Sequence, residues 1–530
     1  MKSVDRCAVI VLLGAMCLPA GAKTRHRRHR PKPLKVQIAK LLNDPAVSRA
    51  HWGIFVTKMD GKPIYALNEA QLFQPASNAK LFTTATALAL LGPAATYETR
   101  VVARGVFGGA SKLTGDVVLI GSGDANLSGR SLPYVAPADR PTSAPSAPDP
   151  LRYLAQMADQ VANTGLKVVN GDVVGDDTLF PWEPYPEDWS IDDAVWGYGA
   201  PISALTINDN QIKVTVTPGE AEGKPATVTL DPDVPYYKLD ASVTTGAAKS
   251  ESAVQMERMP GGKVLRIYGS IAVDAQPDVE EVAIQDPAEY AAVAFKTMLA
   301  ARGIQVTGKA RAQHRISNDA GWFMQASTQP VADLIQRAPL TVAPAGEKVL
   351  ASHVSPPLEE NLVVTNKVSQ NLHAELFLRH LGLTVLGDGS TAQGARVVRA
   401  FLTGSVGIDP DDFVFFDGSG LSGHDLVTPR AAAKLLQYAT TQPWFADWKR
   451  SLPIGGEDGT LAERFPKAPL KDHLFAKTGT LSEARALSGY LECASGKTVI
   501  FSIMVGNHTP RTHDDRDTMD KIVAAIAETN

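Results

Sequence analysis

Strand-like segments at the two ends of this 530-residue chain constrain its fold most strongly. Near the N-terminus, two apolar segments joined by the turn Asp60-Gly61-Lys62 predict a β-hairpin between about residues 51 and 67. Three more strands are predicted within residues 474–505, and helical patterns dominate from about Ser352 up to them. Strands so far apart along the chain, with helices between them, predict one sheet flanked by helices.

The stretch between these parts has a different character. From about Tyr97 to Ala345, short apolar segments alternate with turns rich in Gly, Asp and Pro, which predicts many short strands. The chain is too long for one ordinary domain. We therefore expect a strand-rich region, residues 97–345, inserted into a domain built from residues 36–96 and 346–530.

The first 35 residues predict export. Lys2 and Arg6 precede a short apolar run that ends in small residues, the layout of a secretory signal peptide over residues 1–22. That run is too short to span a bilayer, and we predict no transmembrane segment. Residues 23–35 are rich in Lys and Arg and contain no acid, which predicts a flexible basic tail. The tail is either a solvated leash or an electrostatic tether to an anionic envelope surface.

Charge and cysteine content exclude other classes of protein. The formal net charge is −4 although the tail is basic, so the body is acidic and nucleic acid is not an expected partner. Cys7 and Cys17 lie in the predicted signal peptide, so Cys493 is left alone and no intramolecular disulfide is expected. Metal-ligand spacing is not convincing anywhere, and we expect no metal and no cofactor. Residues 418–423 fit G-x-G-x-x-G, but the next predicted helix begins only at Thr428, which argues against a dinucleotide site.

The tetrad Ser77-Asn78-Ala79-Lys80 begins a predicted helix, after Pro75 and before a run rich in Ala and Leu. Residues three apart lie on one helical face, so the Lys80 amine can reach the Ser77 hydroxyl. A serine becomes a good nucleophile when a neighbouring base removes its proton, and a lysine can be that base if its surroundings keep it neutral. Alone, the tetrad also fits a helix-capping serine beside an ordinary surface lysine.

Two further motifs favour catalysis over that alternative. Ser369-Gln370-Asn371 falls at a polar break between two predicted helices, residues 358–371 and 373–381. Lys477-Thr478-Gly479-Thr480 falls on a predicted strand. Ser-x-x-Lys, then Ser-x-Asn, then Lys-Thr-Gly in this order is the signature of serine β-lactamases and penicillin-binding proteins.

The residue types of the first two motifs suit acyl transfer. Ser77 attacks a carbonyl carbon and forms an acyl-enzyme, with Lys80 as the candidate base. Ser369 can pass a proton towards the leaving amine. Asn371 offers an amide that orients Lys80 and the substrate.

The third motif supplies charge and an anchor for the substrate. Lys477 attracts a substrate carboxylate and favours a neutral Lys80, because two close cations lower each other's pKa. Thr478 and Thr480 offer hydroxyls to the same carboxylate, and Gly479 lets the strand backbone approach the ligand. The backbone N–H groups of Ser77 and Thr480 would form the oxyanion hole.

With these motifs the chain resembles the D-alanyl-D-alanine carboxypeptidase/endopeptidases, the class C low-molecular-mass penicillin-binding proteins. Asp417-Gly418-Ser419-Gly420-Leu421-Ser422 is among the further segments similar to this family. The resemblance implies an α/β (α+β) fold: a penicillin-binding/β-lactamase-like transpeptidase domain, with an antiparallel sheet flanked by helices. The insertion then forms two domains, one nested in the other, the inner one at roughly residues 206–320. Gln370 stands where the family usually has aspartate, from which we expect tuning rather than loss of activity.

The resemblance implies a periplasmic serine DD-peptidase that removes the terminal D-Ala from peptidoglycan stem peptides and also cleaves cross-links. Penicillins and other β-lactam antibiotics would acylate Ser77. A compact β-lactamase has no room for the long stretch of sequence between Lys80 and Ser369. Two alternatives stay open. Rapid turnover of penicillin would indicate a β-lactamase or esterase on the same fold, and glycan binding without penicillin labelling would indicate a non-catalytic peptidoglycan-binding protein.

Overall fold

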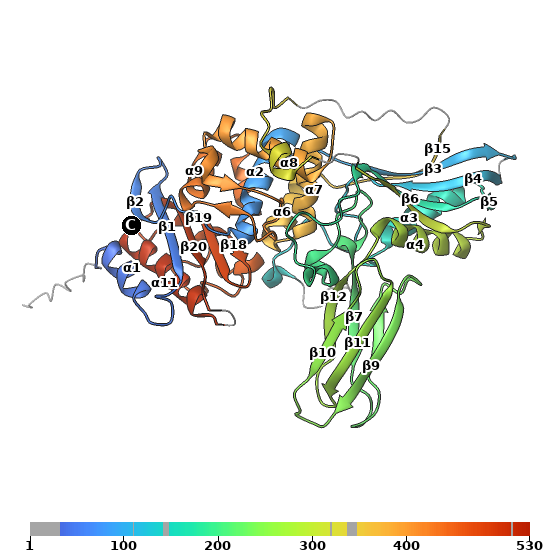
Figure 1. The fold of residues 1–530 in the computed structure, drawn as a ribbon, viewed down its shortest axis with the longest axis horizontal. Helices are drawn as coiled ribbons and strands as arrows, with labels where there is room; N and C mark the ends of the chain where they lie inside the picture. The colour runs from blue at the N-terminus through green and yellow to red at the C-terminus, as the bar shows by residue number, and fades with distance from the viewer. Residues whose placement is uncertain (1–31, 110, 141–147, 318–320, 336–346, 510–511) are drawn as a thin grey trace, which may run out of the picture.

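A five-stranded antiparallel sheet joins the two ends of the chain (Figure 1). The structure is a computed structural model that describes residues 32–109, 111–140, 148–317, 321–335, 347–509 and 512–530. The predicted signal peptide and most of the predicted basic tail lie outside these residues. In sheet order the strands are β18 (Leu474–Thr480), β19 (Ala484–Glu492), β20 (Thr498–Gly506), β1 (His51–Lys58) and β2 (Pro63–Leu67).

Both faces of this sheet are buried, which explains why β20 is apolar at nearly every position. Successive side chains of a strand point to opposite faces. Phe501 and Ile503 belong to the core under α1 and α11, whereas Ile500 and Met504 belong to the core on the other face. The helices are α1 (Leu34–Leu42) and α11 (Asp514–Thr529) on the first face, and α2 (Ala79–Leu91), α6 (Leu358–Lys367), α7 (Asn371–Leu386), α8 (Thr391–Phe401), α9 (Pro429–Ala439) and α10 (Phe445–Ser451) around the second.

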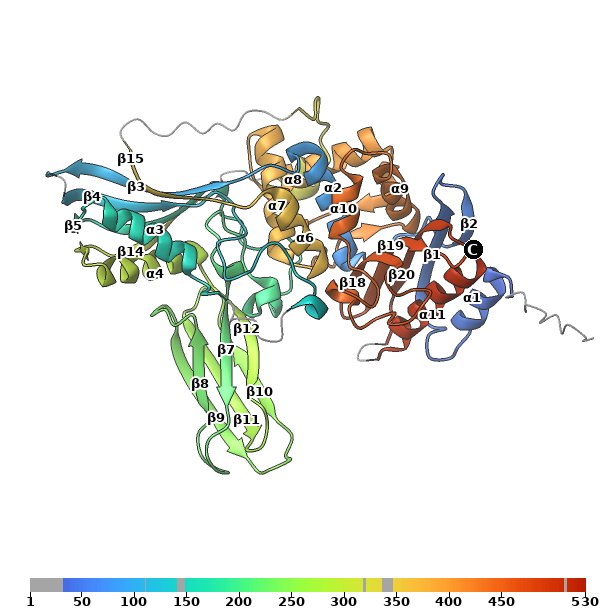
Figure 2. The same cartoon turned by 180° about the vertical axis from the view of Figure 1, so that it is seen from behind.

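A second, seven-stranded sheet is built from the middle of the chain. Its strands are β13 (Gln305–Val306), β5 (Val168–Asn170), β4 (Lys112–Ile120), β3 (Glu98–Phe107), β15 (Lys348–Val354), β6 (Val173–Pro181) and β14 (Ala310–Arg315). Helices α3 (Arg152–Asn163) and α4 (Pro287–Ala301) lie beside it (Figure 2). Strand β15 pairs with β3 and is followed directly by α6, so the chain returns from this sheet to the helices around the first one.

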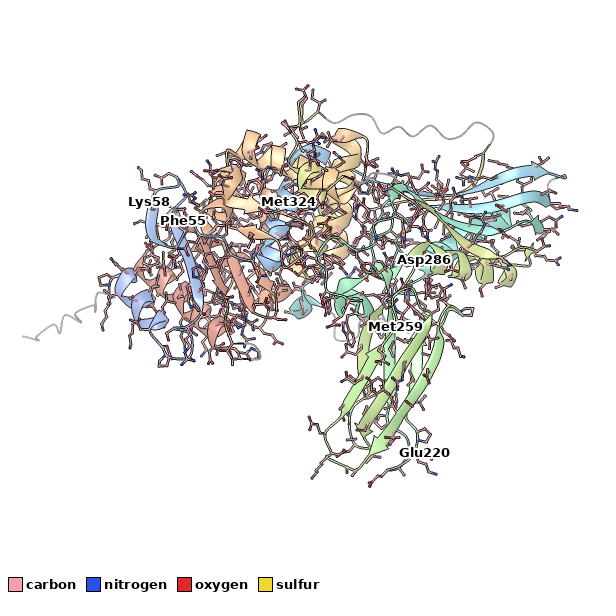
Figure 3. All side chains as sticks on the ribbon, in the orientation of Figure 1. Phe55, Lys58, Glu220, Met259, Asp286 and Met324 are labelled. Carbon is pink, nitrogen blue, oxygen red and sulfur yellow. The ribbon has the colours of Figure 1, made fainter. Side chains whose placement is uncertain are left out.

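Two three-stranded sheets form a third lobe, which projects away from the other two (Figure 1). In Figure 3, Glu220 marks the far tip of this lobe and Asp286 the end near the seven-stranded sheet. One hydrophobic core continues from the seven-stranded sheet into this lobe. The sheets are β12 (Asp278–Ala283), β7 (Gln211–Thr217) and β8 (Thr227–Asp231), and β10 (Ala253–Glu257), β11 (Val264–Ala272) and β9 (Lys238–Gly246).

The predicted sheet flanked by helices is confirmed, and so are several local signals. The hairpin predicted at about residues 51–67 is formed by β1 and β2, and Thr428, where a helix is predicted to begin, caps α9 by accepting a hydrogen bond from the Ala431 amide at 3.1 Å. The predicted helix over residues 358–371 is too long, because Ser369 adopts a positive φ of 63° and the helix stops at Lys367. The division into domains at residues 97, 206, 320 and 345 stays a prediction.

Within the parts of the chain that the structure describes, no helix is both long enough and apolar enough to cross a membrane.

Candidate active site

Ser77 lies in a tight turn that is fixed to the end of the first sheet. The turn, Ala76–Asn78, precedes α2 and packs against β18. The side-chain amide of Asn78 donates a hydrogen bond to the Lys477 carbonyl at 2.9 Å. Ser77 is half-buried, whereas the residues on either side of it are buried, so its side chain is the accessible one in this turn.

Gly479 makes this close packing possible. A Cβ atom at this position would overlap the Pro75 carbonyl and lie 3.1 Å from the Ser77 amide nitrogen. The missing side chain therefore lets the turn seat on β18, a role beyond the approach to ligand predicted from sequence. It also brings the Ser77 amide beside the backbone of β18 near Thr480, which suits the predicted oxyanion pair.

The placement of Gly479 gives a direct prediction. Gly479→Ala should push the turn away from β18, slow acylation of Ser77 on the order of 100-fold and lower the free energy of unfolding by roughly 1–3 kcal/mol. Gly506→Ala is the matched control, because a Cβ on this strand glycine meets no atom within 4 Å. Stopped-flow acylation and chemical denaturation measure both effects, and equal behaviour of the two variants would contradict the packing role.

Lys80 is fully buried, and its ammonium nitrogen reaches three acceptors. It donates to Ser77 Oγ at 2.9 Å, to Asn371 Oδ1 at 2.6 Å and to the Ser419 carbonyl at 2.7 Å. Burial lowers the pKa of Lys80 to about 7, against the opposing effect of the carboxyl groups of Asp417 and others. A substantial fraction of Lys80 is therefore neutral near pH 7, as a base for Ser77 requires.

The motif Ser369-Gln370-Asn371 occupies the break between α6 and α7. Lys477 Nζ donates to Ser369 Oγ at 2.8 Å. Asn371, whose Oδ1 accepts from Lys80, donates from Nδ2 to the Tyr198 carbonyl at 2.8 Å. Gln370 caps α7, because its side-chain oxygen accepts from the Leu372 amide at 3.2 Å. This gives the unusual glutamine a local structural role that leaves the hydrogen bond between Asn371 and Lys80 in place.

The third motif forms the floor of the site. Lys477 is fully buried, and burial, followed by the proximity of Lys80, holds the pKa of Lys477 well below its ordinary value. Thr478 Oγ1 lies 2.7 Å from Thr460 Oγ1, and Thr480 is exposed at the end of β18. The three motifs therefore converge on one site: Lys80 joins Ser77 to Asn371, Lys477 contacts Ser369, and Lys80 is close enough to Lys477 to lower its pKa.

The sequence matches the model of the D-Ala-D-Ala carboxypeptidase 3 (S13) family over residues 34–338 and 337–528. The chain belongs to this family. It is 33% identical to a D-alanyl-D-alanine carboxypeptidase of Actinomadura sp. over 90% of this chain and 81% of that protein. It is 23% identical to the D-alanyl-D-alanine carboxypeptidase DacB of Haemophilus influenzae, over 83% of this chain and 82% of that one.

The fold agrees with this membership of the S13 family. The crystal structure of penicillin-binding protein 4 from Haemophilus influenzae superposes with a TM-score of 0.75, covering 92% of this chain and 98% of that chain at 20% sequence identity. The predicted penicillin-binding fold with additional domains is thus confirmed. As an S13 member, the protein is a serine-type D-Ala-D-Ala carboxypeptidase.

A buried acidic cluster behind Lys80 was not predicted from the sequence. Asp417 accepts hydrogen bonds from the four backbone N–H groups of residues 419–422 and from the indole of Trp189. Glu375 accepts from the Gly418 amide at 2.9 Å, and burial raises its pKa to about 8. Burial also raises the pKa of Asp425 well above its ordinary value. Asp417 thus holds the loop whose Ser419 carbonyl binds Lys80.

The sequence contains signals for this cluster, but by themselves they do not indicate a chemical role. Asp417 opens a segment that resembles the S13 family, and Glu375 follows Asn371 by four positions, which places both on one face of α7. Neither observation tells which side chain lies behind Lys80, because loop 417–422 reaches α2 only through tertiary packing. Thr83 Oγ1 completes that packing by donating to the Gly418 carbonyl at 2.7 Å.

Proposed function

We propose that this enzyme is a peptidoglycan DD-carboxypeptidase and DD-endopeptidase that works through an acyl-enzyme on Ser77. The observation that carries the proposal is the position of Lys80, whose buried amine contacts both Ser77 and Asn371. The reaction class follows from membership of the S13 family. The stem peptide of peptidoglycan is the substrate in which the D-Ala-D-Ala bond occurs.

Acylation begins at Ser77. Neutral Lys80 takes the hydroxyl proton as Ser77 Oγ attacks the carbonyl carbon of the penultimate D-Ala. The carbonyl oxygen becomes an oxyanion, and the backbone N–H groups of Ser77 and Thr480 donate to it. As the C–N bond breaks, Ser369 passes a proton to the leaving nitrogen. That proton is supplied by the two lysines of the site, Lys80 and Lys477.

Hydrolysis of the ester completes the cycle. A water molecule attacks the ester carbonyl while Lys80 removes its proton. The C–O bond to Ser77 breaks, Ser77 regains a proton, and the shortened stem peptide leaves as a carboxylate. Asn371 holds the Lys80 amine in line with Ser77 through both steps.

The substrate carboxylate completes the electrostatics of the site. A carboxylate beside Lys477, Thr478 and Thr480 would accept hydrogen bonds from the two threonine hydroxyls and would lie close to the positive charge of Lys477. The negative charge of the carboxylate favours the ammonium form of Lys477, which in turn favours the neutral form of Lys80. Substrate binding thereby prepares the base for the attack.

Cleavage of cross-links, acylation by β-lactams and action in the periplasm are parts of the same proposal. A β-lactam amide resembles the D-Ala-D-Ala carbonyl and would leave a long-lived ester on Ser77. The Haemophilus influenzae relative has been crystallised with a bound β-lactam, which supports this part. The predicted signal peptide supports export, and the basic residues 23–35 support electrostatic contact with the envelope.

Mass spectrometry of purified muropeptides tests the proposal. Incubation should convert monomeric pentapeptides to tetrapeptides and split cross-linked dimers into monomers. Loss of D-Ala without dimer cleavage would restrict the enzyme to carboxypeptidase activity. Fast release of hydrolysed penicillin would instead indicate a β-lactamase.

The pKa of Lys80 predicts the pH dependence of acylation. Because burial lowers this pKa to about 7, the neutral amine becomes scarcer below pH 7. The second-order rate constant for acylation should therefore fall about tenfold per unit below pH 7 and level off above it. Stopped-flow measurement with a fluorescent penicillin between pH 5 and 9 checks this, and a flat profile would exclude a titrating lysine base.

A further inference from the structure

A hollow of about 610 Å³ lies beside the catalytic strand, between the loop 459–466 and the first turns of α11. The strand β18, the loop and α11 all belong to the lobe seen at one end of Figure 2. Its lining includes Thr460, Arg464, Phe465, Arg516, Asp517 and Asp520.

The hollow adjoins the place where the substrate carboxylate is proposed to bind. Thr460 lines it, and Thr460 Oγ1 lies 2.7 Å from Thr478 Oγ1 of the Lys-Thr-Gly motif. The hollow therefore borders Thr478 on the side where Thr460 lies.

The loop that forms the hollow is firmly held. Asp458, which precedes it, makes a buried ion pair of 2.5 Å with Lys367 of α6. The Gly459 amide donates to the Tyr134 hydroxyl at 3.2 Å. A site fixed in this way is formed before a ligand arrives, which lowers the cost of binding.

The walls of the hollow carry both signs of charge. Arg464 is engaged, because it pairs with Asp520 and its guanidinium lies over the Phe465 ring at 5.3 Å. Arg516 is freer: its side chain is 40% exposed, and its Nε lies 3.6 Å from Asp517 Oδ1. Such walls suit a peptide with free carboxylates and a free amine, whereas an apolar ligand would leave these charges unpaired.

The two reactions of the proposed function differ in what leaves the site. In the carboxypeptidase reaction the leaving group is a single D-Ala, which ends at its carboxylate. In cross-link cleavage the leaving D-centre belongs to the diamino acid of a second stem peptide, and the rest of that peptide continues from the same carbon that carries the carboxylate. The remainder of the second stem peptide needs a binding surface, and the hollow begins beside the proposed position of the carboxylate.

We propose that the hollow binds the second stem peptide of a cross-link, on the leaving-group side, with Arg516 pairing one of its carboxylates. The inference rests on the endopeptidase activity proposed above. It assigns the choice between monomeric and cross-linked substrates to loop 459–466 and α11.

Variants at Arg516 test the assignment. For Arg516→Ala we expect kcat/KM on a purified cross-linked muropeptide dimer to fall about 5- to 10-fold through a higher KM. Removal of D-Ala from the monomeric pentapeptide should stay within about twofold, since its leaving group ends before the hollow. Arg516→Glu should enlarge the loss on the dimer alone. Lys521→Ala, which removes an exposed charge on α11 outside the lining, is the matched control.

The outcomes separate the two levels of the proposal. Wild-type enzyme that never cleaves the dimer refutes the endopeptidase activity, and the subsite with it. Dimer cleavage that is equal in wild type and both Arg516 variants refutes the subsite and leaves the activity intact. Equal losses on monomer and dimer also refute it, because Arg516 then acts on the whole site. A loss confined to the dimer, in variants whose melting temperatures match wild type, supports it.

Discussion

Replacing Ser77 by alanine is expected to abolish both covalent labelling by penicillin and release of D-Ala. The change removes the hydroxyl oxygen proposed to form the ester, Ser77 Oγ, which lies 2.9 Å from the Lys80 amine. Without it, substrate should still bind, but no acyl-enzyme should form. Gel fluorescence with a labelled penicillin and chromatographic detection of D-Ala measure the two losses.

The Ser77→Ala protein should remain folded, which makes the experiment decisive. The hydroxyl lies in a half-buried position, so its removal opens no large cavity. Ser495→Ala, in the exposed turn between β19 and β20, is the matched control and should keep full activity. Normal D-Ala release by Ser77→Ala would refute the acyl-enzyme mechanism, since no other residue is proposed to carry the ester.

Replacing Lys80 by methionine should slow acylation by about 100- to 10,000-fold, the range for loss of a general base. Methionine fills a similar volume without the amine. The Ser419 carbonyl and the Asn371 side chain each lose a hydrogen-bond donor, which costs roughly 1–3 kcal/mol per unsatisfied group. The cost of burying a charge disappears at the same time, as the lowered pKa of Lys80 indicates. The two effects oppose each other, so the change in stability should be modest.

Two readouts separate loss of a base from loss of structure. The variant should unfold at nearly the wild-type temperature, and its residual acylation should lose the rise with pH near 7. Lys434→Met on α9, which changes an exposed lysine outside the site, is the control. Acylation within tenfold of wild type would mean that another group removes the proton from Ser77.

The parts of the fold that depend on local signals were predictable. Apolar spacing and the Thr428-Pro429 pair define α9, and alternating apolar segments define β1, β2 and the C-terminal strands. The three motifs were recognisable for the same reason, because each is a short sequence on one element, and the structure brings their side chains together. Ser-x-x-Lys in particular needs only the geometry of a helix start to bring Ser77 and Lys80 together.

The parts that depend on tertiary packing were not predictable. The end of α6 is set by the positive φ of Ser369, which no propensity rule assigns to a serine. The cluster of Glu375, Asp417 and Asp425 exists only because loop 417–422 packs on α2. Gly479 likewise shows its packing role only once the Pro75 carbonyl is seen against β18.

The packing of the Ser77 turn on β18 also determines when the site can be completed during synthesis of the chain. Asn78, next to the nucleophile, and Lys477, whose carbonyl it binds, lie 399 positions apart in the sequence. During synthesis Ser77 therefore emerges long before β18, the strand against which its turn packs. Contacts this distant form late and slowly. A partly made chain carries Ser77 but lacks β18, so we expect no acylation of Ser77 until the last strands are in place.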